Sequence, residues 1–154
     1  MAKIELITAG DQKFTQFKKI EDEFIKRIGH YINFSVSSVK VKNIKDEKKL
    51  IHIESEKIQK KINREDYVIA LDRSGIEMSS TEFASFISEK ALRNSKKIVF
   101  LIGSAAGISN DLISISDKII SFSKMTFTHD IFKIVFLEQL YRAFTIIKGQ
   151  RYHR

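Results

Sequence analysis

Apolar residues along the chain form short runs and alternations that predict strands, separated by stretches with helical spacing. Residues 67–71 and 98–102 are continuous apolar runs, which are typical of strands buried on both faces of a sheet. Residues 3–8, 32–41 and 119–122 are shorter or alternating segments that also favour strands. The pattern therefore predicts a sheet of five strands.

Between these strands, apolar residues recur every three to four positions, as they do on one face of a helix. Ser79 and Glu82 have the spacing of a capping box and predict the start of one helix. The last helix is apolar over most of its circumference, so we expect it in the core, in a dimer interface, or in both. The five predicted helices run from Phe14 to Gly29, over residues 46–63, from Ser79 to Ala91, over residues 111–115 and over residues 129–148.

The alternation of helices with buried strands predicts the fold class. It is typical of an α/β domain with a mainly parallel sheet flanked by helices. No linker, repeat or shift in composition divides the sequence, so we expect a single domain over residues 1–154. The helix at residues 46–63 is rich in lysine, and its predicted inward stripe is narrow: Leu50, Ile51, Ile58 and Ile62.

The charge balance favours a polyanionic partner. Lysine and arginine number 27 against 19 aspartate and glutamate residues, a net charge of +8. No acidic residue follows Glu138, whereas four basic residues do: Arg142, Lys148, Arg151 and Arg154. Such a surplus suits phosphate contacts. From composition alone, a basic surface that only aids solubility remains an equal alternative.

Several kinds of site are not predicted. The chain has no cysteine, which excludes disulfides, thiolate metal sites and a cysteine nucleophile. Its four histidines lack metal-binding spacing, so we expect no metal. No dinucleotide or Walker glycine pattern is present. Residues 1–6 do not resemble a signal peptide and no apolar run would span a bilayer, so we expect a cytoplasmic protein without membrane contact.

Three loops that follow predicted strands carry residues suited to a ligand. They are residues 71–75, 103–107 and 121–127. In an open parallel sheet, ligands bind at the carboxyl ends of strands, where these loops would gather. Glycines allow backbone to approach a ligand, although tight turns alone are the alternative. His129 is predicted at the start of the last helix, where it would cap the helix or shape the neighbouring loop.

The end of the chain combines rings with positive charge. Tyr152 and His153 lie between Arg151 and Arg154. RNA bases stack on aromatic rings and on guanidinium planes, so this pattern suits RNA. The alternative is a frayed basic tail.

Five motifs, in order, resemble those of one family, the bacterial SPOUT (α/β-knot) methyltransferases of the large-subunit rRNA methyltransferase H group. The motifs are Leu71-Asp72-x-x-Gly75, Leu101-Ile102-Gly103-x-x-x-Gly107, the segment from Ser121 to Phe127 followed by His129, the segment from Glu138 to Ala143, and Tyr152-His153-Arg154. The resemblance covers the whole chain and is strongest from Tyr67 onward.

The resemblance implies an activity, a topology and an assembly. It implies S-adenosylmethionine-dependent methylation of N3 of a pseudouridine in 23S rRNA, a C-terminal trefoil knot, and a homodimer packed through the last helix. With no added RNA-binding module, we expect the substrate to be the assembled ribosome rather than free RNA.

The resemblance also implies roles for individual residues. Arg142, Tyr152 and His153 would orient the substrate, and would complete the site of the partner subunit. The residues implied to bind the cofactor are Leu71, Gly103, Phe122, Ser123, Lys124, Met125, Thr126 and Phe127. The group that takes the N3 proton or stabilises the resulting anion is left open among Asp72, His129, Arg142 and His153.

The chain departs from the family pattern at four positions. Ser104 and Ala106 replace a glycine and a larger residue in the glycine loop, Thr128 replaces a proline, and Ile76 replaces a basic residue. These changes bear on turnover and loop rigidity. Two other hypotheses therefore stay open: a non-enzymatic basic ribosome-binding or assembly factor derived from the same fold, and a nucleotide-binding α/β regulator.

Overall fold

The computed structural model describes residues 2–10, 14–94 and 96–154, and it contains one parallel sheet. The strands are β1 (Lys3–Ala9), β2 (Asn33–Val39), β3 (Tyr67–Glu77), β4 (Ile98–Ile102) and β5 (Lys118–Ser121). Their order across the sheet is β2-β1-β4-β3-β5, and every pairing is parallel. The predicted fold class, an α/β domain around a parallel sheet, is confirmed.

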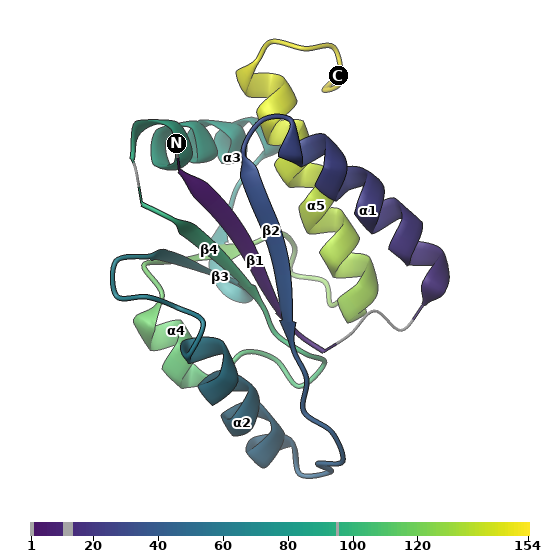
Figure 1. The fold of residues 1–154 in the computed structure, drawn as a ribbon, viewed down its shortest axis with the longest axis vertical. Helices are drawn as coiled ribbons and strands as arrows, with labels where there is room; N and C mark the ends of the chain where they lie inside the picture. The colour runs from purple at the N-terminus through teal and green to yellow at the C-terminus, as the bar shows by residue number, and fades with distance from the viewer. Residues whose placement is uncertain (1, 11–13, 95) are drawn as a thin grey trace.

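The helices cover both faces of this sheet. They are α1 (Thr15–Gly29), α2 (Glu47–Gln59), α3 (Ser80–Ile87), α4 (Asn110–Ile115) and α5 (His129–Ile147), and a short π-helical segment, η1 (Ser88–Leu92), continues α3. Helices α1, α3 and α5 pack on one face, and α2 and α4 on the other (Figure 1). Each face has its own apolar core, so the central strands are buried from both sides.

Side chains close in sequence cap the starts of three helices, α2, α3 and α4. The Asp46 side chain accepts hydrogen bonds from the backbone N–H groups of Lys48 and Lys49 and caps α2. The predicted capping box is present, since Ser79 accepts from the Glu82 backbone and Glu82 accepts from that of Ser79. Ser109 caps α4 through the backbone N–H of Leu112.

Two elements differ from their sequence predictions. Helix α2 ends at Gln59 rather than at residue 63, because the chain turns at Lys60. Of the predicted stripe only Ile58 is fully buried, and Glu54 and Ser55 are buried beside it. The stripe pattern missed these two polar residues because their burial depends on partners that are distant in sequence.

Strand β3 is the second difference, because it continues past residue 71 to Glu77. Leu71 and Ile76 both pair with Ile120 of β5, and the residues between them form an irregularity. A Cβ atom at Gly75 would lie 2.6 Å from backbone atoms of Ile119, so only glycine fits this crossing. The trefoil knot stays a prediction.

The strand register places the predicted ligand loops at one edge of the sheet. Thr8 near the end of β1 pairs with Ile102 at the end of β4, and with Ser38 near the end of β2. Because all strands are parallel, the segments after β3, β4 and β5 leave from this same carboxyl edge. None of the described helices is both long and apolar enough to cross a bilayer.

Candidate functional site

A cleft of about 250 Å³ opens at the carboxyl edge of the sheet. The middle of β3 at residues 71–73, the end of β4, the glycine loop at residues 103–107 and the segment after β5 enclose it, together with the start of α5. The three loops singled out from the sequence therefore meet in one place. Seven of the eight residues predicted to bind a cofactor line this cleft: Leu71, Gly103, Phe122, Ser123, Met125, Thr126 and Phe127.

Lys124 is the predicted residue whose side chain the structure places elsewhere. Its side chain is 88% exposed, and its ammonium lies 3.9 Å from a carboxylate oxygen of Glu77. Its position in the segment after β5 follows the predicted motif. Its side chain, however, is directed toward solvent rather than toward the cleft.

The glycine loop is closed by contacts that need its glycines. The backbone N–H of Gly107 donates to the carbonyl of Ser104 at 2.8 Å, and Gly107 has a φ of 96°. A Cβ atom at Gly103 would lie 2.5 Å from the carbonyl oxygen of Gly107. A Cβ at Gly107 would meet nothing within 4 Å, so its backbone faces open space at the cleft.

Helix α2 supports the glycine loop from the opposite face of the sheet. The Ser104 hydroxyl donates to Glu54 at 2.9 Å, and the Ser109 hydroxyl donates to that of Ser55 at 2.8 Å. Burial raises the pKa of Glu54, and the hydrogen bond from Ser104 only partly opposes this effect. Neither Glu54 nor Ser55 was predicted as part of the site, and a carboxylate inside a lysine-rich helix gives no local sign of burial.

His129 contacts the same loop from its other side. As the first residue of α5 it places Nδ1 3.2 Å from the Gly103 carbonyl oxygen. A carbonyl can only accept, so this nitrogen carries the hydrogen. Thr128, the cap residue of α5, makes no side-chain capping bond. Of the two predicted roles of His129, the contact favours shaping the loop.

Hydroxyl groups organise the segment after β5. The Ser121 hydroxyl donates to the Ser123 carbonyl, and the Ser123 hydroxyl accepts from the backbone N–H of Met125. Arg73 donates to the Thr126 hydroxyl at 3.1 Å and ties this segment to the turn after Leu71. The segment is thereby held as one wall of the cleft.

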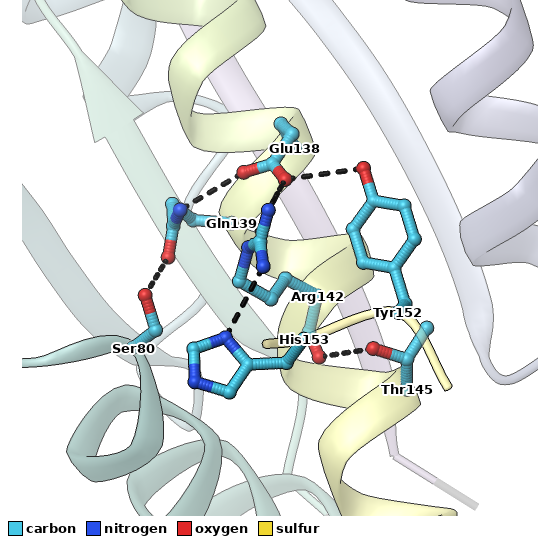
Figure 2. Close-up of polar contacts among 7 residues, drawn as sticks. All are labelled: Ser80, Glu138, Gln139, Arg142, Thr145, Tyr152 and His153. Carbon is cyan, nitrogen blue, oxygen red and sulfur yellow. Dashed lines mark hydrogen bonds and ion pairs between the residues drawn. The ribbon is translucent and has the colours of Figure 1, made fainter. Parts of the chain in front are cut away.

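The predicted substrate residues form a separate cluster near the end of α5 (Figure 2). Arg142 donates to the Glu138 carboxylate and to Nδ1 of His153, the latter at 3.1 Å. Its guanidinium also lies 4.8 Å from the centre of the Tyr152 ring, a cation–π distance. The structure thus brings Arg142, Tyr152 and His153 together, in a tail folded back on the helix.

Glu138 is the residue that joins this cluster. It accepts from Arg142 and, at 3.1 Å, from the Tyr152 hydroxyl, while Gln139 donates to its other oxygen (Figure 2). Burial raises the pKa of Tyr152, and the negative charge of Glu138 adds to the effect. Tyr152 is therefore a neutral hydrogen-bond donor at physiological pH. The sequence placed Glu138 in a motif without indicating this role.

Within one chain the cluster and the cleft lie on different stretches of α5. Phe132 is the last residue of α5 that lines the cleft, and Arg142 follows 10 residues later, which corresponds to about 15 Å along the helix axis. The structure therefore does not bring the substrate residues to the cleft of their own chain. Among the described residues, no group of three or more histidine, aspartate or glutamate side chains could hold a metal ion.

The chain is similar to named proteins over nearly its whole length. The family described as "Predicted SPOUT methyltransferase" matches residues 2–153. Relatives from Carboxydothermus hydrogenoformans and Clostridium kluyveri are 37% identical, and one from Caldicellulosiruptor bescii is 36% identical. Each is named "Ribosomal RNA large subunit methyltransferase H", and each comparison covers 98% of this chain and 99% of the relative.

A solved structure supports the fold independently. The probable methylase family protein from Haemophilus influenzae Rd KW20 has a TM-score of 0.56, covering 99% of this chain and 70% of that one. Its sequence identity is 13%, so this similarity concerns the fold alone.

Proposed function

Because the chain belongs to the SPOUT methyltransferase family, in the large-subunit rRNA methyltransferase H group, we propose that it methylates N3 of a pseudouridine in 23S rRNA. The methyl donor is S-adenosylmethionine. The observation that carries this proposal is the meeting of three strand-end segments in one cleft at the carboxyl edge of the sheet.

The residues of the cleft fit this donor. Leu71, Phe122 and Phe127 supply apolar walls for an adenine ring, and the open backbone at Gly107 allows polar atoms of the donor to approach closely. Backbone N–H and C=O groups of residues 122–127 would complete the binding of the donor. S-adenosylmethionine supplies a methyl group activated by a sulfonium, which transfers in line to a nucleophile.

Arg142, Tyr152 and His153 orient the target base in this proposal. Arg142 lies about 15 Å along α5 from the cleft of its own chain, and Tyr152 and His153 contact Arg142, which supports their acting on the cleft of a partner subunit. We therefore propose a homodimer that packs through α5. Apolar side chains exposed near the cleft, including Met125, Phe127 and Ile131, support such packing.

Methylation of the pseudouridine requires that its N3 atom lose a proton. The guanidinium of Arg142 is permanently charged, so it can stabilise the anion that forms at the imide. His153 accepts from Arg142 through Nδ1, which leaves Nε2 as its donor toward the substrate. Glu138 fixes Arg142 and Tyr152 in position, because both side chains donate to the same carboxylate.

The proposal extends to topology and place of action. A trefoil knot is supported by the close crossing of Gly75 and β5, where the chain after β5 would pass the turn between β3 and α3. An assembled ribosome is the proposed substrate, because a domain of this size needs the shape of a large partner for specificity. That substrate places the protein in the cytoplasm.

The first prediction is methyl transfer to ribosomes. Ribosomes from cells lacking this protein should accept labelled methyl groups in the presence of the purified protein and S-adenosylmethionine, and the label should map to N3 of one pseudouridine in 23S rRNA. Free 23S rRNA should accept far less. Label at another position would refute the assigned nucleotide, and equal labelling of free RNA would refute ribosome recognition.

The non-enzymatic ribosome-binding factor remains the second candidate, because Ser104 and Ala106 depart from the family pattern in the glycine loop. Calorimetric titration with S-adenosylmethionine separates the two candidates. Micromolar affinity, about −8 kcal/mol, supports the enzyme. No detectable binding, with ribosome binding retained, supports the factor.

A further inference from the structure

A lysine surface projects beyond the carboxyl edge of the sheet, and neither the cleft nor the tail accounts for it. It consists of Lys42 and Lys45, in the connection between β2 and α2, and Lys48 and Lys49, in the first turn of α2. All four side chains are exposed, and within the described part of the chain none of their ammonium groups forms an ion pair.

Strand register places this surface beside the cleft. The connection begins directly after Val39, which pairs with Ala9 at the end of β1, and β1 in turn pairs with β4. Gly103 directly follows β4, so two strand spacings, about 10 Å, separate the end of β2, where the connection begins, from the start of the glycine loop. Figure 1 shows this connection leaving the same edge of the sheet.

Specific contacts hold the lysine surface in place relative to the cleft. Asp46 caps α2 between Lys45 and Lys48, and its charge is directed toward the backbone of the first turn. Further along α2, Glu54 accepts from Ser104 of the glycine loop at 2.9 Å. The ammonium groups of Lys48 and Lys49 are therefore presented by a helix that is hydrogen-bonded to the wall of the cleft, and Lys42 and Lys45 lie in the connection that leads into it.

We propose that this lysine surface binds the phosphate backbone of rRNA next to the methylated nucleotide. The proposal rests on the rRNA methyltransferase activity and adds where the RNA lies. Exposed lysines act as point charges for phosphate, and counterion release favours such contacts on RNA. Between Lys40 and Arg64 basic residues outnumber acidic ones by nine to four, which accounts for most of the net charge of the chain.

The segment that follows the other end of α2 provides a matched control. Lys60, Lys61 and Arg64 are also exposed and, among the described residues, also lack ion pairs. They precede Tyr67, the first residue of β3, so they lie at the amino edge of the sheet, away from the cleft. Charge reversal there changes the net charge equally without altering the proposed RNA contact.

The second prediction compares these two surfaces in one assay. The triple variant K42E/K45E/K49E should raise the KM for ribosomes about tenfold or more, with unchanged affinity for S-adenosylmethionine in calorimetry. Affinity for the ribosome should also depend less steeply on salt. The magnitude of the slope of log affinity against log salt concentration should decrease by about 0.7 to 0.9 for each phosphate that the variant no longer neutralises. The matched variant K60E/K61E/R64E should stay within a few-fold of the unmodified protein.

The outcomes separate this inference from the function on which it rests. No transfer by the unmodified protein would refute the proposed function itself. Equal losses in the two triple variants would show that total charge alone attracts RNA, and no loss in either would show that the lysine surface does not touch the RNA. The neutral variant K42Q/K45Q/K49Q should show a smaller loss with the same reduced salt slope, and an unreduced slope would overturn the inference.

Discussion

Ser104 shows how one side chain connects the cleft to the far side of the sheet. Its hydroxyl donates to Glu54, whose carboxylate is buried under α2. A glycine at position 104 could not make this bond. Ser104 therefore gives the loop a side-chain attachment, and this specific contact replaces some of the conformational freedom that a glycine would have.

The third prediction concerns the pH dependence of stability at Glu54. Burial raises its pKa above 4.5, so just above pH 4.5 the folded protein keeps a proton that the unfolded chain has lost. Stability should therefore fall as the pH rises from 4.5 to the folded pKa. The isosteric E54Q variant lacks this effect, so its stability relative to the unmodified protein should increase over the same window in urea denaturation.

A second variant sharpens the comparison. S104A removes the hydroxyl whose hydrogen bond partly lowers the pKa of Glu54, so the pH window over which stability falls should widen. The same variant loosens the glycine loop and should weaken binding of S-adenosylmethionine by a few-fold. Parallel profiles of unfolding free energy against pH for the unmodified protein and E54Q would contradict the assigned effect of burial on Glu54.

Helices α1 and α5 are joined by a buried ion pair as well as by apolar packing. The ammonium of Lys133 lies 2.7 Å from Glu21, and the two side chains are 10% and 2% exposed. Glu21 has the helical spacing of the apolar residues around it, and it is buried on the inward face of α1. Lys133, which neutralises Glu21, lies on α5, so this pairing depends on how α5 packs against α1.

The fourth prediction is the cost of breaking this pair. E21A or K133A leaves a buried charge without its partner, which should lower the free energy of unfolding by about 3–5 kcal/mol. The apolar double variant E21L/K133M should lose much less, because it buries no charge. Denaturant unfolding of the four proteins tests this, and single-variant losses below about 1 kcal/mol would contradict it.

At the scale of the whole molecule, the cleft and the cluster of Arg142, Tyr152 and His153 lie apart along α5. In the proposed homodimer each active site takes its cleft from one chain and its tail from the other. That assembly requires the cleft and the tail of one chain to lie apart.

The fifth prediction tests the composite site by mixing inactive variants. A106W should fill the cleft, and Y152A/H153A should remove the tail without affecting the cleft of the same chain. Each homodimer should be inactive. Random mixing makes half of the dimers heterodimers with one intact site of two, so activity should return to about a quarter of the unmodified level. Tails that act on their own chain would give no recovery.

The sequence by itself determined the elements and the location of the site. The apolar runs at β3 and β4 are local patterns that only a doubly covered strand explains, and the loops that follow them must emerge at one edge of a parallel sheet. Strand direction therefore predicted that the three loops meet, and the family resemblance implied the seven individual residues that line the cleft.

Tertiary structure decided the partners of the buried polar groups. Glu54 meets Ser104 across 50 residues of sequence, and Glu21 meets Lys133 across a longer separation. Glu138 becomes the centre of the tail cluster only because the chain folds back after α5. Periodicity shows which face of a helix is apolar, but a polar residue on that face is explained only by the group that satisfies it. That group depends on how the helices pack.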